Sequence, residues 1–517
     1  MVVQSPYPDV EIPEVSLADL VLESARVRGD KPALIDGPSG RTITYHEFTL
    51  GVGSMAAGLA ARGFGKGDVF AIYSPNVPEY AVAFHGVAKA GGAVTTINPL
   101  YTVEELTFQL NDSQARYLLT IPLFLEQANE AAAASKVEEV FVLGDAEGAT
   151  PIMALLGTGG EVPQVDIDPK EDLVVLPYSS GTTGLPKGVM LTHHNLVSNI
   201  MQCEPPHATG ENDVIIGVLP FFHIYGMTVI MNIALRRGAT VVTMPRFDLG
   251  DFLRILQDYK VSRAYLVPPI ILALAKQPVV EQFDLSSLDI IMSGAAPLSG
   301  DLAAEAGKRL GALVMQGYGL TETSPVTHMI PDEPGRDRAG SIGFPIPNTE
   351  CKIVDPVGGQ EVGADEMGEL WIRGPQVMKG YLNNDDATKI TLDDEGWLHT
   401  GDMAKVDEDG YFFIVDRLKE LIKYKGYQVP PAELEAVLLS HPKIADAAVI
   451  PVADEEAGEI PKAYVVAQGV DGGEIMNYVA ERVAPYKKIR KVEFVDEIPK
   501  SASGKILRRV LIDRERA

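Results

Sequence analysis

Short apolar segments alternate with helical patterns along the first half of this 517-residue chain, and this alternation constrains the fold more than any other feature. Val69–Tyr73, residues 93–97 and Tyr117–Thr120 are apolar and about as long as a typical buried strand. A helical pattern at 80–89 lies between the first two and ends at a glycine pair. Strands separated by helices favour mostly parallel sheets with covering helices. The sequence therefore predicts an α/β architecture.

The chain is long enough to require more than one domain. At 517 residues it exceeds what one hydrophobic core usually holds. A charged run that begins at Asp416, D-R-L-K-E-L-I-K-Y-K-G-Y-Q-V, marks a change in composition, because the acidic excess of the chain lies before it. Beyond it, helical and apolar patterns between 432 and 467 indicate a small α+β unit. We therefore predict a large N-terminal domain, residues 1–415, and a small C-terminal domain, residues 416–517.

The overall composition restricts the class of partner and the compartment. The net charge of −27 at pH 7 argues against nucleic acid or an anionic membrane surface as the main partner. The two cysteines are too few for a disulfide scaffold and fit a reducing compartment. The first residues carry no secretory pattern, and no apolar run is as long as a membrane span. We expect a cytoplasmic enzyme without an integral membrane segment, while its oligomeric state stays open.

A stretch rich in glycine and hydroxyl side chains follows the apolar run 173–176. It reads Y-S-S-G-T-T-G-L-P-K-G-V-M-L-T-H, from Tyr178 to His193. Glycines let a backbone approach a polyanion, and main-chain N–H groups, hydroxyls and Lys187 can bind its oxygens. A Walker P-loop is excluded, because that motif needs Gly-Lys followed by Ser or Thr, whereas Lys187 follows proline and precedes glycine. A flexible surface loop is the alternative, but such loops rarely follow a buried strand directly, so we predict a phosphate-binding loop.

Three later motifs carry side chains that suit a nucleotide. Q-G-Y-G-L-T-E-T offers Tyr318 as a flat face for a base, Thr321 as a hydrogen-bond donor and Glu322 as a hard oxygen ligand for Mg²⁺. W-L-H-T-G-D places Asp402 in what we expect to be a tight glycine-bearing turn, where a carboxylate can accept both hydroxyls of a ribose. P-K-S-A-S-G-K places Lys505 in a loop near the end of the chain, where a mobile ammonium can offset negative charge.

Together these motifs resemble the signatures of the adenylate-forming superfamily, which includes acyl-CoA synthetases, 4-coumarate:CoA ligases, firefly luciferases and peptide-synthetase adenylation domains. The resemblance covers nearly the whole chain. It is closest to the 4-coumarate:CoA ligases, to which the segments G-A-V-T-T, L-V-P-P-I-I-L-A-L-A-K and K-Y-K-G-Y-Q-V are similar. It implies a ligase that uses ATP, Mg²⁺ and coenzyme A, forms acyl-AMP and pyrophosphate from a carboxylic acid, and then transfers the acyl group to CoA.

The resemblance implies a role for each motif residue at the nucleotide. In such enzymes Lys505 offsets the charge that develops during adenylation, Lys187 and the loop hydroxyls hold the β- and γ-phosphates, and Glu322 holds Mg²⁺. The nucleotide-binding residues implied in this way are Ser179, Ser180, Gly181, Thr182, Thr183, Gly184, Lys187, Ala295, Gln316, Gly317, Tyr318, Thr321, Asp402, Arg417, Lys419 and Lys505.

The aromatic segment L-P-F-F-H-I-Y-G holds His223, a residue type that among apolar neighbours is more often packed in a core. By the resemblance, this histidine moves between positions and helps to admit the carboxylate or the thiol. The implied acyl pocket is formed by Phe222, Ile224, Tyr225, Met292, Gly294, Pro325 and Val326. Several plant ligases carry lysine where Met292 stands here. We expect 4-coumarate or cinnamate-like acids, with medium- or long-chain fatty acids as the alternative.

The resemblance also implies a second conformation for the thioester-forming step. The C-terminal domain would rotate about a hinge at Lys419 and withdraw Lys505 from the acyl site. The residues that would then face CoA or the acyl site are Arg246, Lys423, Lys425, Gly426 and Gln428, although Arg246 could also be simply solvated.

Three other functions are weighed against the CoA ligase. A ligase that loads a carrier protein would use the same adenylation residues, and Arg246 and Lys425 favour free CoA over it. A luciferase-like monooxygenase is disfavoured, because luciferases tend to carry a second histidine in the segment F-F-H-I-Y-G. A non-catalytic nucleotide-binding protein would be expected to have lost Glu322, Asp402 or Lys505, and all three are present.

Overall fold

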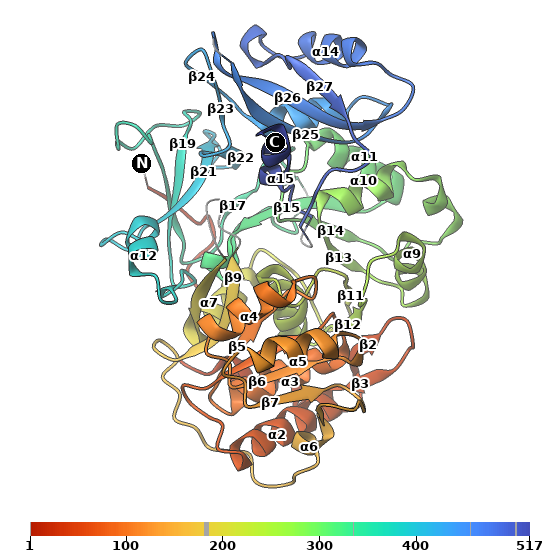
Figure 1. Cartoon of the computed structure of the whole chain (residues 1–517), viewed down its shortest axis with the longest axis vertical. Helices are drawn as coiled ribbons and strands as arrows, with labels where there is room; N and C mark the ends of the chain where they lie inside the picture. The colour runs from red at the N-terminus through yellow and green to blue at the C-terminus, as the bar shows by residue number, and fades with distance from the viewer. Residues whose placement is uncertain (1, 180–185, 334, 455, 502–503, 517) are drawn as a thin grey trace.

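The computed structural model of the chain describes residues 2–179, 186–333, 335–454, 456–501 and 504–516. Figure 1 shows a large lower body, which runs from the N-terminus to the cyan strands, and a smaller blue body above it. Within the described residues, three sheets build the lower body and a fourth builds the upper one. The architecture is α/β with a small α+β C-terminal part, which confirms the predicted fold class.

One large sheet contains the strands that the apolar runs predicted. Its described strands lie in the order β20-β10-β9-β5-β4-β6-β7-β8, parallel from β9 to β8, with β10 and β20 as antiparallel additions at one edge. Both faces are covered, which is why these strands are nearly continuous apolar runs. Their bounds are β4 Val69–Tyr73, β5 Ala93–Thr96, β6 Tyr117–Thr120, β7 Glu139–Val142, β8 Thr150–Pro151, β9 Leu173–Ser179, β10 Lys187–Thr192 and β20 Gly380–Tyr381.

A second large sheet carries most of the later motifs at its strand ends. Its order within the described residues is β17-β16-β15-β14-β13-β11-β12-β2-β3, and it is parallel from β15 to β2. Parallel strands direct their carboxyl ends to the same edge, where α/β proteins bind ligands. The bounds are β2 Pro32–Asp36, β3 Thr42–Thr44, β11 Val214–Gly217, β12 Thr240–Thr243, β13 Arg263–Leu266, β14 Ile290–Ser293, β15 Leu313–Gly319, β16 Val326–Met329 and β17 Phe344–Pro345.

Helices cover both large sheets, and local sequence signals set where they begin. Thr44 and Glu47 form a capping box at the start of α2, and Thr102 and Glu105 form another at the start of α4. The longer helices of the large body are α1 Leu17–Ala25, α2 Tyr45–Ala61, α3 Pro78–Lys89, α4 Val103–Asp112, α5 Leu125–Ala133, α7 His193–Cys203, α9 Leu249–Asp258, α10 Pro268–Lys276, α11 Gly300–Leu310 and α12 Asp385–Thr391.

A third, antiparallel sheet corrects one sequence-based prediction. Its strands are β1 Val3–Gln4, β18 Glu350–Val354, β19 Gly368–Arg373, β21 Leu398–Val406 and β22 Phe412–Arg417. Asp402 was expected in a tight turn, but it lies inside β21 and pairs with Arg417. Gly401 has a φ of +69°, a backbone conformation that is common in turns. Here, however, Gly401 lies where the pairing of β21 with β19 shifts register, as in a bulge. The turn prediction was therefore wrong.

The C-terminal part has its own sheet and its own core. Ile422, Leu434, Val449 and Val465 are fully buried in one cluster. Its elements are β23 Ile422–Tyr424, β24 Tyr427–Val429, α13 Pro431–Leu439, β25 Ile444–Asp454, β26 Gly458–Ala467, α14 Gly472–Ala480, β27 Lys491–Phe494 and α15 Arg508–Arg516. The expected hinge residue, Lys419, lies in the connection between β22 and β23. The domain border at 415 and the hinge stay predictions.

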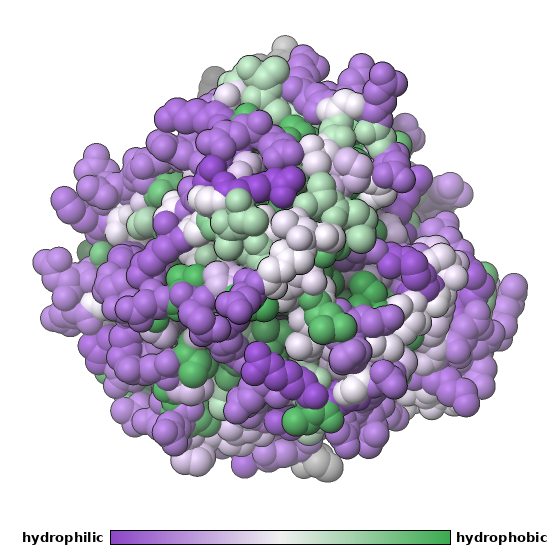
Figure 2. Space-filling model, turned by 90° about the horizontal axis from the view of Figure 1, so that it is seen from below, coloured by the Kyte–Doolittle hydropathy of each residue, from purple (hydrophilic) through white to green (hydrophobic). Residues whose placement is uncertain are grey.

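The surface is mainly hydrophilic on the face opposite the C-terminal part. Figure 2 shows this face, which α2 and α6 (Met153–Leu156) reach in Figure 1, with small apolar groups scattered among hydrophilic ones. In the part of the chain that the structure describes, no helix is both long and apolar enough to cross a membrane.

Candidate active site

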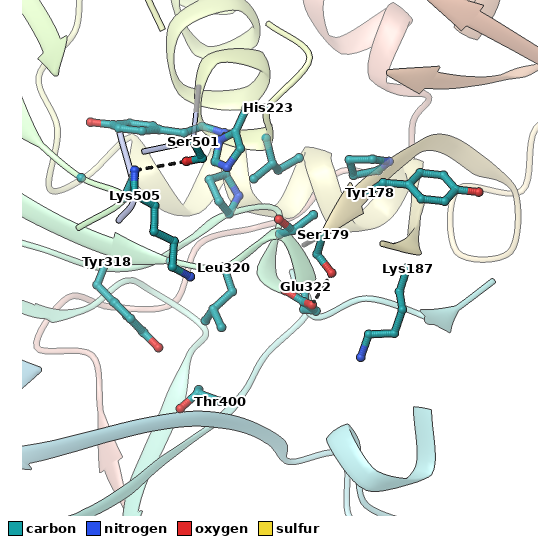
Figure 3. Close-up of a pocket in the computed structure, with 18 of the residues that line it drawn as sticks. Tyr178, Ser179, Lys187, His223, Tyr318, Leu320, Glu322, Thr400, Ser501 and Lys505 are labelled. Carbon is teal, nitrogen blue, oxygen red and sulfur yellow. Dashed lines mark hydrogen bonds between the residues drawn. The ribbon is translucent and has the colours of Figure 1, made fainter. Parts of the chain in front are cut away.

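A cavity of about 850 Å³ lies where the large body meets the C-terminal part. Strand ends of both large sheets line it, and so do Ser501, Lys505 and Leu507 of the C-terminal part. In Figure 3, Ser179, Glu322 and Lys187 lie on one side of the cavity, and His223, Ser501 and Lys505 lie on the other. The fold thus brings together motifs that are more than 300 residues apart in the chain.

The two ends of the predicted phosphate loop are held by strand pairing. Ser179 ends β9 and Lys187 begins β10, and the two residues are partners across the antiparallel ladder. Both line the cavity. The predicted residues Ser180, Gly181, Thr182, Thr183 and Gly184 fall between them and lie outside the described residues.

Glu322 lies in a short 3₁₀ turn, η4 Thr321–Thr323, directly after β15. Its Oε1 accepts a hydrogen bond from the Ser179 hydroxyl at 3.1 Å and another from the Tyr381 hydroxyl at 2.7 Å. Among the described residues, no group of three or more His, Cys, Asp or Glu side chains could hold a metal ion. The single carboxylate of Glu322 still fits Mg²⁺, because Mg²⁺ is usually bound by one or two carboxylates together with substrate phosphates and water. Glu322 would be the residue that holds it.

Tyr318, Asp402 and Arg417 form a polar cluster at the wall of the cavity. The Tyr318 hydroxyl donates to Oδ2 of Asp402 at 2.6 Å, and the Arg417 Nε lies 3.3 Å from Oδ1. Burial raises the pKa of the Asp402 carboxyl, and the positive charge of Arg417 opposes that shift. Tyr318 and Arg417 line the cavity, whereas Asp402 lies behind them. Each oxygen of the carboxylate thus has a protein partner in this structure.

The segment after β14 provides part of the cavity wall. Ala295 has a φ of +68°, a left-handed conformation that a residue with a side chain rarely adopts. Gln316 Oε1 accepts a hydrogen bond from the Leu298 amide at 3.1 Å, which links this segment to β15. Ala295, Gly317 and Thr321 line the cavity, but Gln316 is buried behind it. Contact of Gln316 with a nucleotide stays a prediction.

His223 lies two residues before the start of a π-helix, η2 Tyr225–Asn232, in the large body. Its Nδ1 accepts a hydrogen bond from the Tyr225 amide at 3.3 Å, so the proton of the neutral ring is on Nε2. Burial, and then the nearby charge of Lys505, lower the His223 pKa to about 4. His223 is therefore a neutral hydrogen-bond donor near pH 7.

The predicted acyl pocket is an apolar and aromatic part of the same cavity. All of its predicted residues line the cavity: Phe222, Ile224, Tyr225, Met292, Gly294, Pro325 and Val326. The Tyr225 hydroxyl donates to the Met292 carbonyl oxygen at 3.0 Å. A Cβ at Gly294 would lie 2.7 Å from the Tyr225 ring, so only glycine leaves space there.

Further wall residues of the acyl pocket were missed by sequence reasoning. Val229, Tyr265 and Met329 line the cavity, and the rings of Tyr225 and Tyr265 meet edge to face with centroids 6.5 Å apart. Apolar side chains that alternate in a strand or follow a helix carry no chemical signal of a site. Their role could be found only from the fold.

Lys505 reaches the cavity from the C-terminal part. Its backbone amide donates to the Ser501 hydroxyl at 3.1 Å, and Gly504 before it has a φ of +79°. Burial lowers the pKa of the Lys505 ammonium to about 8, and the charge of Arg417 acts in the same direction. Leu418 and the predicted hinge residue Lys419 also line the cavity.

The residues predicted for CoA and for the second half-reaction do not line this cavity. Lys423 and Gln428 lie in the exposed β23–β24 hairpin, which Figure 1 shows at the outer edge of the C-terminal part. Lys425 at its tip pairs with Glu456 at 2.7 Å. Gly426 has a φ of +84°, and Arg246 is exposed on the large body. Their roles stay predictions.

Comparison with known proteins covers nearly the full chain. The family described as AMP-binding enzyme matches residues 21–382, and the AMP-binding enzyme C-terminal domain matches residues 433–505. The chain is 45% identical to 4-coumarate–CoA ligase 3 of Oryza sativa subsp. japonica, over 99% of this chain and 94% of that protein. It is 44% identical to 4-coumarate–CoA ligase 1 of Petroselinum crispum, over 99% and 96%. The solved structure of the anthranilate CoA ligase AuaEII with anthranoyl-AMP is 28% identical, with a TM-score of 0.90 over 98% of both chains.

Proposed function

This chain belongs to the AMP-binding enzyme family and is an AMP-forming acid:CoA ligase that uses ATP and CoA, and we propose that its preferred acids are 4-coumarate and related cinnamic acids. The observation that carries the proposal is that one cavity is lined by the paired ends of the phosphate loop, by an aromatic pocket and by the partly buried Lys505. Cytoplasmic location and Mg²⁺ as the metal belong to the same proposal.

The adenylation step places the acid between the two sides of the cavity. The carboxylate oxygen attacks the α-phosphorus of ATP, a bond forms between them, and the bond to pyrophosphate breaks. Lys187 binds the outer phosphates, and Thr321 donates to the α-phosphate. Glu322 would hold Mg²⁺, which would supply positive charge to offset that of the leaving pyrophosphate.

Two residues prepare the carboxylate for this attack. The Lys505 ammonium, with a pKa of about 8, is mostly protonated near neutral pH and offsets the negative charge shared by carboxylate and α-phosphate. His223 presents its Nε2–H, because its Nδ1 is occupied by the Tyr225 amide. It can therefore orient a carboxylate or carbonyl oxygen by donating a hydrogen bond.

In the second step the CoA thiolate attacks the acyl carbonyl and AMP leaves. Lys505 occupies one approach to that carbonyl, so we propose that the C-terminal domain, residues 416–517, rotates about Lys419. Lys423 and Gln428 would then face the acyl site, while Lys425, Gly426 and Arg246 contact CoA. Separate lysine loops on one small domain support this alternation.

The acyl pocket supports an aromatic acid with a phenolic hydroxyl. Tyr225 and Tyr265 offer ring edges and faces to a planar substrate. The Tyr225 hydroxyl donates its proton to Met292 O, so its oxygen keeps a lone pair that can accept a hydrogen bond from a phenol. Medium- or long-chain fatty acids are the second candidate, because Met292 adds an apolar, flexible wall without a cation.

The proposal is tested by ATP–pyrophosphate exchange without CoA, across 4-coumaric, cinnamic, benzoic and medium- to long-chain fatty acids. We expect the highest kcat/KM for 4-coumarate, and a Tyr225→Phe variant should lose its preference for 4-coumarate over cinnamate. Highest exchange with alkyl acids would overturn the substrate and make the enzyme a fatty acyl-CoA synthetase. A parallel assay offers CoA or a phosphopantetheine-bearing carrier as acceptor, and transfer to the carrier alone would overturn CoA.

A further inference from the structure

Tyr381 is a buried residue of the cavity wall that the motifs did not single out. It is 4% exposed and belongs to β20, a two-residue strand at the edge of the first large sheet. It pairs with Val189 of β10, and the neighbouring Leu382 amide donates to the Gly188 carbonyl at 2.8 Å. The backbone of Tyr381 is thereby fixed to the strand that begins with Lys187.

The hydroxyl of Tyr381 acts on one oxygen of the Glu322 carboxylate. It donates to Oε1 at 2.7 Å, and the Ser179 hydroxyl donates to the same oxygen at 3.1 Å. The Met378 amide, in the segment just before β20, donates to the Glu322 backbone carbonyl at 2.9 Å. Among the hydrogen bonds of the described residues, both bonds to the carboxylate reach Oε1 and none reaches Oε2, the oxygen that we expect to face the cation.

The ring of Tyr381 acts on a different group. The Lys187 ammonium nitrogen lies 4.1 Å from the centroid of the ring, within the range of a cation–π contact. A lysine side chain has several rotatable bonds, and contact with a buried ring restricts its orientation. One buried residue therefore contacts both ionic groups that are expected at the phosphates.

We propose that Tyr381 is a positioning residue for adenylation, whose hydroxyl orients Glu322 toward Mg²⁺ and whose ring face orients Lys187 toward the phosphates of ATP. The inference rests on the proposed roles of Glu322 and Lys187. Because hydroxyl and ring act on different partners, the two effects can be separated by substitution. Tyr381→Phe removes only the hydroxyl, and Tyr381→Leu removes both.

The test measures ATP binding by calorimetry, once with Mg²⁺ and once with EDTA, together with the Mg²⁺ concentration that half-saturates ATP–pyrophosphate exchange. Binding reports the site without turnover. The matched control is Tyr7→Phe, because the Tyr7 hydroxyl also donates to a glutamate, Glu333, at 2.7 Å but lies outside the cavity. Glu322→Gln tests the carboxylate itself, and thermal unfolding verifies that each variant is folded.

For Tyr381→Phe we expect the half-saturating Mg²⁺ concentration to rise about tenfold, as when a partner of a metal ligand is removed. Its ATP affinity in EDTA should stay within about twofold of the parent, because the ring still contacts Lys187. Tyr381→Leu should lose affinity in EDTA as well, and Tyr7→Phe should change neither quantity.

Three results would count against the inference. If Glu322→Gln changes the half-saturating Mg²⁺ concentration but Tyr381→Phe does not, the role of the Tyr381 hydroxyl is refuted. If Tyr381→Phe and Tyr381→Leu have the same ATP affinity in EDTA, the role of the ring is refuted. An unchanged Mg²⁺ dependence in Glu322→Gln would instead refute the proposed role of Glu322, and the inference would fall with it.

Discussion

The C-terminal part carries two lysine-bearing loops in very different surroundings. Lys505 is partly buried at the cavity, and desolvation there lowers its pKa to about 8. Lys423 and Lys425 lie on an exposed hairpin at the outer edge, where Lys425 pairs with Glu456. Among the described residues, Lys505 lines the cavity, whereas Lys423 and Lys425 do not. This difference supports adenylation as the step that the described arrangement suits, and we expect thioester formation to need the hairpin that carries Lys423 and Lys425.

The largest effect is expected from removing Lys505, the lysine at the cavity. Lys505→Ala should slow ATP–pyrophosphate exchange by about 100- to 1,000-fold, because a charge aimed at the transition state is lost. The same variant should convert synthetic acyl-AMP and CoA to acyl-CoA at nearly the parent rate. Lys443→Ala, which removes a lysine paired with Glu474 on the outer face, serves as the control. Equal loss of both half-reactions would remove the distinction between the loops.

A smaller effect, on the other half-reaction, is expected from a substitution in the exposed hairpin. At Gly426 the φ of +84° makes a residue with a Cβ cost about 1–2 kcal/mol. Gly426→Ala should therefore slow acyl transfer from acyl-AMP to CoA by about tenfold. Pyrophosphate exchange should be unaffected, since the hairpin is remote from the cavity. A matched change at Gly469, which also has a positive φ and faces open space, should alter neither half-reaction. A loss of exchange in Gly426→Ala would contradict the assignment.

The pH dependence of the two half-reactions tests the different roles of the two loops without a substitution. The Lys505 ammonium must be protonated for adenylation, and its pKa of about 8 means that the active form is lost as pH rises through 8. Exchange at pH 9 should be about tenfold lower than its plateau, because each pH unit above the pKa removes tenfold of the protonated form. Acyl transfer from acyl-AMP should lack this descending limb. Lys505→Arg should move the limb to higher pH, and a limb that stays in place would exclude Lys505 as its source.

The smallest effect is expected from weakening a hydrogen bond between β22 and α13, which lie on either side of the expected hinge. Oδ2 of Asp416, in β22, accepts a hydrogen bond from the Ala432 amide of α13 at 2.8 Å. This bond joins β22, on the N-terminal side of the expected hinge at Lys419, to α13 on its C-terminal side, and we expect it to break when the parts rotate about that hinge. Asp416→Asn should weaken it by about 1 kcal/mol. Small-angle scattering and the ratio of the two half-reaction rates should then shift toward the rotated form, and a shift in the reverse direction would contradict that role.

Much of the fold could be predicted from local patterns. The strands Val69–Tyr73 and Tyr117–Thr120 have the predicted bounds, because buried parallel strands are continuous apolar runs. The Asp402 turn was wrong, because a glycine with positive φ occurs in bulges as well as in turns. The pairing of β21 with strands on both sides overrides the local signal.

The site could be predicted only where side chains carry distinctive chemistry. Glu322 and Lys505 line the cavity as expected, because their motifs combine charge with glycine. Tyr381 was missed, since the pair Gly-Tyr has no special chemistry until it pairs with β10, which lies almost 200 residues earlier. Tyr265 was missed because an aromatic residue in a buried strand is typical of any core.

Different parts of the chain supply different walls of the cavity, and this affects how the specificity and the rates of such an enzyme can be altered. The predicted acyl pocket, from Phe222 to Met329, is built by the large body, while the described residues after the expected hinge at Lys419 that line the cavity are Lys500, Ser501, Lys505 and Leu507. We therefore expect the preference for an acid and the balance of the two half-reactions to depend on different parts of the chain. Exchanging the C-terminal part with that of a relative should alter the balance of the two half-reactions and leave the choice of acid in place.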